Sequence, residues 1–200
     1  MSTATGHRQA AAVELLPVPL DEHLDNVGTT FADELDRGLF NVWRNSFPAE
    51  HVPWGREVEI EGIPFVVPAK VRGRPDNVRC SGQLVRVPAG RYDWVHVLAA
   101  SERRTEDALL LHFADGSVDR ESLRVSDFWS APAHFAEAEA LATPVMHYPH
   151  HVQARVSAKL WMQRVPVTRR AELRLVRLPR NVAIHVLAMT LASVRVGPPR

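Results

Sequence analysis

The residues best able to do chemistry form the run His-Tyr-Pro-His-His at positions 147–151. Its imidazoles and phenol supply hydrogen-bond donors and acceptors, and an imidazole titrates near neutral pH. Such a run could contact a ligand, act as a general acid or base, or hold a metal ion. His150 and His151 are adjacent, so their side chains point to opposite faces of an extended chain, which makes chelation awkward. We therefore predict ligand contact through His147, Tyr148, His150 and His151, and no metal.

A second chemical feature is Trp161, which stands on the polar side of an alternating strand pattern together with Arg155. An indole ring on a sheet face can stack on the apolar face of a sugar while polar neighbours bond the sugar hydroxyls. Alternatively, the N-terminal segment covers that face and Trp161 anchors the cover. We predict that Trp161 and Arg155 belong to the ligand site.

The irregular stretch 38–56 carries Trp43, Arg44 and Asn45. Long structured loops in β-sandwiches often hold the ligand, so these residues are expected to contact it as well. The prediction is that this loop meets the 147–151 run beside Trp161.

Other reactive side chains have simpler explanations. His96, His112 and His185 lie within apolar strand patterns, which predicts buried neutral imidazoles hydrogen-bonded to a neighbour. Cys80 is the single cysteine, so it forms no internal disulfide and is expected to be a packed thiol. The sequence contains no glycine-rich phosphate loop, no G-x-S-x-G elbow and no H-E-x-x-H pair, and we expect no cofactor.

The elements that must position these residues are short β-type runs bounded by Pro, Gly, Asn and Asp. The runs cover residues 57–60, 64–67, 83–87, 92–98, 109–113 and 118–125. Their spacing is typical of an all-β antiparallel sandwich or jelly roll with little helix. An Asp-Gly pair at 115–116 predicts a hairpin between the last two runs.

The clearest strand pattern covers residues 152–162, where apolar and polar residues alternate. Residues 171–178 and 182–191 follow as two more strands. The stretch 133–142 has helix-forming composition and predicts a short helix or a loop with a helical turn.

The chain is expected to form a single sandwich domain over residues 13–196, with a disordered leader at 1–12 and a tail at 197–200. The apolar phase of the strands predicts the core. It contains Leu109, Leu111, Phe113, Val156, Ala158, Leu160, Ile184 and Val186.

Composition excludes several classes of protein. The 200 residues are 46% hydrophobic and 24% charged with a formal net charge of +1, which is ordinary for a globular domain. No stretch approaches the apolar length of a membrane span, and the first residues do not form a signal peptide, so a cytoplasmic protein without membrane contact is expected. Residues 151–200 carry ten bases and one acid, whereas residues 1–50 carry eight acids and three bases. A basic face that balances the acidic first quarter is the favoured interpretation, and nucleic acid is not expected as a partner.

Several motifs occur in order along the chain: SFPAEHVPWG (46–55), GIPFVVP (62–68), PDNV (75–78), GQLVRVPAGRY (82–92), HFADGS (112–117), SDFW (126–129) and LPRNVAIHVLAMTL (178–191). This progression resembles the galactose-binding-like, jelly-roll accessory modules attached to bacterial glycoside hydrolases. The resemblance implies a jelly-roll sandwich with a carbohydrate-binding or accessory role, here without an attached catalytic domain. Such an inference is one of analogy, because sandwiches host many functions.

Three functions follow as hypotheses. The first is non-catalytic binding of a carbohydrate or sugar conjugate through the predicted site. The second is a small stand-alone enzyme of secondary metabolism, a cyclase, isomerase or lyase with a histidine as general acid or base. The third is an interaction protein that docks an acidic partner through its basic face. A small-molecule or carbohydrate ligand is the expected partner, and the sequence leaves a homo-oligomer open.

Overall fold

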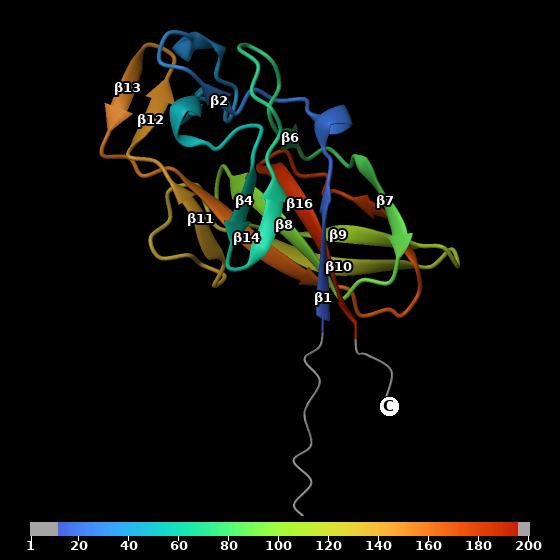
Figure 1. Cartoon of the computed structure of the whole chain (residues 1–200). Helices are drawn as coiled ribbons and strands as arrows, with labels where there is room; N and C mark the ends of the chain where they lie inside the picture. The colour runs from blue at the N-terminus through green and yellow to red at the C-terminus, as the bar shows by residue number, and fades with distance from the viewer. Residues whose placement is uncertain (1–11, 196–200) are drawn as a thin grey trace, which may run out of the picture.

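The alternating runs of the sequence form strands that pair in two antiparallel sheets, as the computed structural model of residues 12–195 shows (Figure 1). The large sheet has the order β1 (Ala12–Val18), β16 (Ile184–Arg195), β8 (Trp94–Ser101), β14 (Lys159–Pro166) and β11 (Ala138–Ala142), and β6 (Val78–Arg79) also pairs with β16. The small sheet has the order β10 (Val118–Val125), β9 (Thr105–Phe113), β15 (Leu173–Arg177) and β7 (Leu84–Gly90).

The strand order identifies the topology. Without β6 and β11, the two sheets contain eight strands, which can be numbered 1 to 8 in chain order. The large sheet then has the order 1-8-3-6 and the small sheet the order 5-4-7-2. This is the double Greek-key order of a jelly roll. The predicted all-β antiparallel sandwich is therefore confirmed. The leader and tail predicted at 1–12 and 197–200 lie outside the described residues, except for Ala12, which begins β1.

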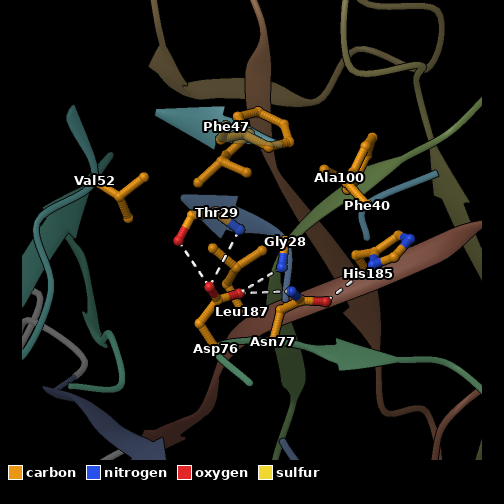
Figure 2. Close-up of a pocket in the computed structure, with 11 residues that line it drawn as sticks. Gly28, Thr29, Phe40, Phe47, Val52, Asp76, Asn77, Ala100, His185 and Leu187 are labelled. Atoms are coloured by element: carbon orange, nitrogen blue, oxygen red, sulfur yellow. Dashed lines mark hydrogen bonds between the residues drawn. The ribbon is translucent and has the colours of Figure 1, made fainter. Parts of the chain in front are cut away.

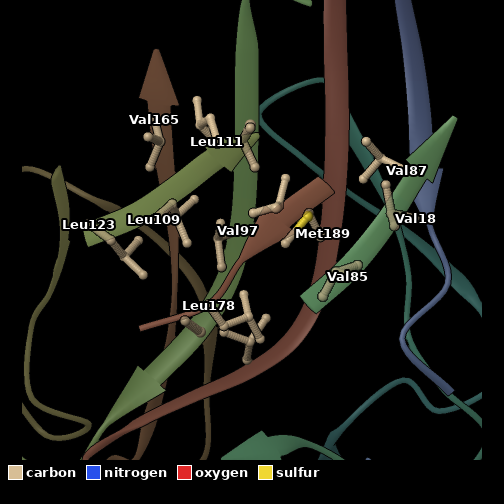
Figure 3. Close-up of a cluster of buried hydrophobic side chains, with 14 of the residues drawn as sticks. Val18, Val85, Val87, Val97, Leu109, Leu111, Leu123, Val165, Leu178 and Met189 are labelled. Atoms are coloured by element: carbon tan, nitrogen blue, oxygen red, sulfur yellow. The ribbon is translucent and has the colours of Figure 1, made fainter. Parts of the chain in front are cut away.

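The core between the two sheets is formed by one face of each (Figure 3). Val95 and Val97 of β8 pack there, and Leu109 and Leu111 of β9 come from the facing sheet; all four are fully buried. Because the side chains of a strand alternate between faces, the intervening residues point away from this core.

The opposite, outer face of the large sheet is also buried, because an irregular layer covers it. Leu98 of β8 and Leu160 of β14 pack on this face with Phe65 and Val67 of the cover. The cover contains β2 (Thr29–Thr30), β3 (Phe47–Pro48), β4 (Glu57–Ile60), β5 (Ile63–Val66), β12 (Val145–Tyr148) and β13 (His151–Ala154). It also contains the 3-10 turns η2 (Leu35–Arg37) and η3 (Ala49–His51). The 3-10 turn η1 (Asp21–His23) lies instead between Leu20 and Leu24, which pack against the core between the sheets. The central strands of the large sheet are therefore apolar on both faces.

Most strand predictions are confirmed, including the Asp-Gly hairpin between β9 and β10, where Gly116 has φ 84°. Two are wrong. Residues 133–142 do not form a helix, because Ala138–Ala142 is the edge strand β11 paired with β14. The pattern at 152–162 is not one strand either, because the chain turns at Arg155 (φ 63°) between β13 and β14.

The predicted core residues are buried with one exception. Val156 is half-buried, because it lies in the turn that separates β13 from β14. Among the described residues, no helix has the length and apolar character that a membrane span requires.

Two arginines of the last quarter form ion pairs with acids from the middle of the chain. Arg169 contacts Asp119 with a shortest distance of 2.6 Å, and Arg170 contacts Asp93 at 3.0 Å. Both pairs use acids outside the first quarter, while Glu14 of the first quarter lines the same cavity as these two arginines.

Truncation on β9 tests the two-sided packing. Leu111→Ala should lower the free energy of unfolding by about 2–5 kcal/mol, because it opens a cavity between the sheets. The matched variant Leu110→Ala, at a half-buried site on the other face of the same strand, should cost clearly less. Urea denaturation measures both. Equal losses would contradict the assigned orientation of the strand.

Candidate functional site

The structure brings the 147–151 run to the loop that contains residues 41–45, as the sequence predicts. Ser46 and His147 exchange two backbone hydrogen bonds of 3.0 and 2.9 Å, which place β12 directly beside the end of this loop. The His147 ring is buried and its Nδ1 lies 3.0 Å from the hydroxyl of Thr30, which also bonds the Ser46 hydroxyl. His147 thus joins β12 to the loops, and its ring is not open to solvent.

The other residues of the predicted site differ in exposure. Tyr148 and His151 stack with ring centroids 5.0 Å apart, and His150 is exposed. In the loop, Trp43 is 66% exposed and Asn45 is buried. Arg44 and Arg155 are exposed, each with a positive φ. The ligand-binding role of these residues stays a prediction.

Trp161 does not lie with them. Its side chain is 2% exposed and packs in the core between the two sheets, where its indole N–H donates to the carbonyl of Asp127 at 3.0 Å. The expectation of an open polar face was wrong because both faces of β14 are covered. The large sheet separates Trp161 from the hydrophobic cluster against which Tyr148 packs.

A buried carboxylate connects the segments of the cover (Figure 2). Asp76 Oδ1 accepts from the Gly28 backbone N–H at 2.9 Å and from Asn77 Nδ2 at 2.8 Å. Its Oδ2 accepts from Thr29 N–H at 3.1 Å, Thr29 Oγ1 at 2.7 Å and Lys70 Nζ at 2.5 Å. Both members of the Lys70–Asp76 ion pair have almost fully buried side chains. This cluster is satisfied by its own partners and leaves a cavity of only about 10 Å³.

His185 continues this network into the large sheet (Figure 2). Asn77 donates through its Nδ2, so its Oδ1 accepts from His185 Nδ1 at 2.9 Å. Within residues 12–195 the other ring nitrogen, Nε2, makes no hydrogen bond, and Glu102 Oε1 lies 3.8 Å away. Phe40 covers the imidazole at a centroid distance of 4.5 Å. The predicted buried imidazole with a polar neighbour is confirmed here.

Two neighbouring cavities lie farther along the outer face of the same sheet. The first has a volume of about 90 Å³ and apolar walls: Val52, Pro53, Val58, Ile60, Val67, Leu98, Ala140, Leu141, Leu160 and Leu187. The second has a volume of about 240 Å³ and mixed walls: Glu61, Ile63, His96, Ala136, Ala138, Met162, Gln163 and Arg164.

The strand register shows that these cavities are adjacent. One step of two residues leads from Leu98 to His96 on β8, and from Leu160 to Met162 on β14. Ile60 of the first cavity is paired with Ile63 of the second in the β4–β5 hairpin. A two-residue step along a strand is about 6.6 Å, so one small molecule is long enough to reach from the apolar cavity into the mixed cavity.

His96 lines the mixed cavity, although the sequence analysis did not include it in the ligand site. It is 6% exposed, and its Nδ1 is fully buried with no hydrogen-bond partner among the described residues, contrary to the prediction of a bonded neighbour. In the sheet it lies between Arg164 of β14 and Thr190 of β16. Burial, with a further contribution from the charge of Arg164, lowers the pKa of His96, so the ring is neutral at neutral pH. Its position in an apolar strand gave no signal of the cavity.

Two further observations concern the cysteine and the possible metal ligands. Cys80 is fully buried, and burial raises the pKa of its thiol far above the usual range, as expected for a packed and unreactive cysteine. Between residues 12 and 195, no three His, Cys, Asp or Glu side chains gather closely enough to hold a metal ion.

The buried ion pair predicts a large mutational effect. Asp76→Asn should lower the free energy of unfolding by about 3–5 kcal/mol, because Lys70 would remain buried without its counter-charge. The control Asp33→Asn removes an exposed partner of Arg72 and should leave stability unchanged within error. Chemical denaturation compares them. A small effect of Asp76→Asn would show that the cover does not depend on this carboxylate.

The buried histidines predict a loss of stability in mild acid. Burial lowers the pKa values of His96, His147 and His185 in the folded protein. Below about pH 6.5, the ordinary histidine pKa, the unfolded chain therefore binds protons first. The free energy of unfolding should be full above this pH and fall as the pH drops below it. Urea denaturation at several pH values on both sides of 6.5 tests the prediction, and a value that stays constant or rises on acidification would contradict it.

Comparison with known proteins assigns the chain to a family. A family model described as the AziU2-like beta-sandwich domain matches residues 11–195. No curated protein matches the chain. The match supports a β-sandwich module, whereas the likeness to glycoside hydrolase accessory modules rests on the sequence motifs alone. The match spans all of the described residues, and its description agrees with the observed sandwich: this protein belongs to the AziU2-like beta-sandwich domain family.

Proposed function

We propose that this protein binds a small molecule with an apolar portion on the outer face of its large sheet. The observation that carries the proposal is the apolar cavity of about 90 Å³ next to the mixed cavity that contains the buried His96. Ligand sites are typically mostly apolar pockets with a few converging polar groups and a residue of perturbed pKa. The two cavities together have this character.

The apolar cavity favours a specific kind of ligand group. Its walls are aliphatic side chains from the large sheet and from the cover, including Leu98, Leu187 and Val67. An apolar cavity of this kind stays dry and binds small apolar molecules, and one of about 150 Å³ holds benzene. The smaller volume here fits a branched alkyl group.

The cavities favour some of the functions inferred from the sequence over others. A sugar conjugate with an apolar portion remains compatible with the cavities, whereas a free sugar would leave the aliphatic walls without a partner. An enzyme would use the same site, with His96 as its neutral imidazole. The basic face has less support, because Arg169 and Arg170 are already paired with acids.

The test uses 5-methylhexan-1-ol, which joins a branched alkyl tail to a neutral hydroxyl. Ligand-observed NMR should detect binding with a dissociation constant of about 1 mM, or about −4 kcal/mol, as expected for so few atoms. Ala140→Leu, which fills the apolar cavity, should weaken binding at least about tenfold.

The matched control is Ala142→Leu, two residues away on the same edge strand, at an exposed position. It should bind the alcohol like the wild type. Absence of binding to the wild type, or equal binding by both variants, would contradict the proposed site.

A further inference from the structure

We propose that the polar end of the ligand is a carboxylate, held by the Nε2–H of His96 and the guanidinium of Arg164. This inference rests on the proposed function and adds to it the chemical class of the ligand. It is based on the contacts around His96, on the charge of Arg164 and on the distance between the two cavities.

The surroundings of His96 assign its tautomer. Its Nδ1 is fully buried and meets no donor or acceptor in the described part of the chain. An orphaned N–H is rarer in proteins than an under-satisfied acceptor, so the proton is assigned to Nε2. Nε2 makes no hydrogen bond within residues 12–195 and is not among the fully buried polar atoms, so it is the nitrogen that reaches the cavity. The neutral ring therefore presents a donor, which calls for an acceptor on the ligand.

The neighbouring polar groups favour an anionic acceptor. Arg164 lies directly opposite His96 in the register of β14 and β8, and its guanidinium stands 5.3 Å from the centroid of the Trp94 ring. In the part of the chain that the structure describes, Arg164 has no ion-pair partner. The amide of Gln163 is already used, because it donates to the Arg124 carbonyl and accepts from the Arg164 backbone N–H. His96 and Arg164 are thus the groups left to bind a ligand.

One acid works against an anion in this cavity. Glu61 lines it from the turn between β4 and β5, where it is exposed with φ 49°. Its charge opposes that of Arg164, although solvent screens an exposed carboxylate. Removal of this charge should therefore tighten the binding of a carboxylate, whereas removal of the Arg164 charge should weaken it.

The distance between the cavities limits the length of the ligand. The step from Leu98 to His96 is about 6.6 Å along β8. An extended acid with three methylene groups between its branch point and its carboxylate spans a comparable distance. Such an acid, 5-methylhexanoate, places its branched end among the leucines and its carboxylate at His96.

The experiment compares 5-methylhexanoate with 5-methylhexan-1-ol, which differs only at the polar end. Dissociation constants are measured by ligand-observed NMR at pH 7.5. The wild type should bind the acid at least about tenfold more tightly than the alcohol, because a charge-assisted hydrogen bond replaces a neutral one.

The variants locate the source of this preference. Arg164→Gln should remove most of the preference for the acid and leave the affinity for the alcohol unchanged. Glu61→Gln should tighten the acid about two- to threefold. Arg174→Gln, which removes an exposed arginine from the small sheet, should change neither affinity. His96→Phe keeps a ring and removes the donor, and it should also lose the preference; if this variant does not fold, Arg164→Gln decides.

Each failure has a separate meaning. Equal binding of acid and alcohol by the wild type would overturn the carboxylate assignment and leave the proposed function intact. A preference for the acid that survives Arg164→Gln would place the carboxylate elsewhere and also overturn it. Binding of neither compound would contradict both proposals.

Discussion

The buried carboxylate of Asp76 is the interaction on which the covered architecture depends. A charge with no exposure is tolerated only when it is paired and hydrogen-bonded, and Asp76 receives five donors from Gly28, Thr29, Lys70 and Asn77. These donors come from two separate segments of the cover, so one side chain fixes both above the large sheet. Gly28 approaches so closely that a Cβ there would meet Asn77 Nδ2 at 2.3 Å, which explains the absence of a side chain.

The cover in turn creates the two environments of the outer face. Near Asp76 the loops close tightly, and His185 is sealed beneath Phe40 with Asn77 as its partner. Farther along the sheet, the β4–β5 hairpin and the edge strand β11 leave the apolar and mixed cavities. Two buried imidazoles of one sheet face therefore differ in their contacts. His185 is hydrogen-bonded to Asn77, whereas His96 lies beside the mixed cavity and makes no hydrogen bond with the described residues.

Local patterns in the sequence predict the strands well, because a half-buried strand has a period of two. Leu109 and Leu111 on β9 follow that rule, and their burial could be predicted. The rule fails where both faces of a sheet are covered: Trp161 looks like a surface residue between polar neighbours, yet it packs between the two sheets, while the cover buries Leu160 on the other face. The importance of Asp76 and the cavity beside His96 depend on segments far apart in the chain, which no local pattern reports. The approach of the 147–151 run to Ser46 was predicted only as an assumption.

If a ligand enters the outer face of the large sheet and not the core between the sheets, the leucines of the two faces must respond differently to it. Methyl-resolved NMR during titration with 5-methylhexanoate tests it directly, because leucine methyl groups report on both faces. We expect shifts for Leu98, Leu160 and Leu187, which line the apolar cavity, and none for Leu109 and Leu111 between the sheets. Shifts confined to the leucines between the sheets, or to residues around the exposed Trp43, would contradict it.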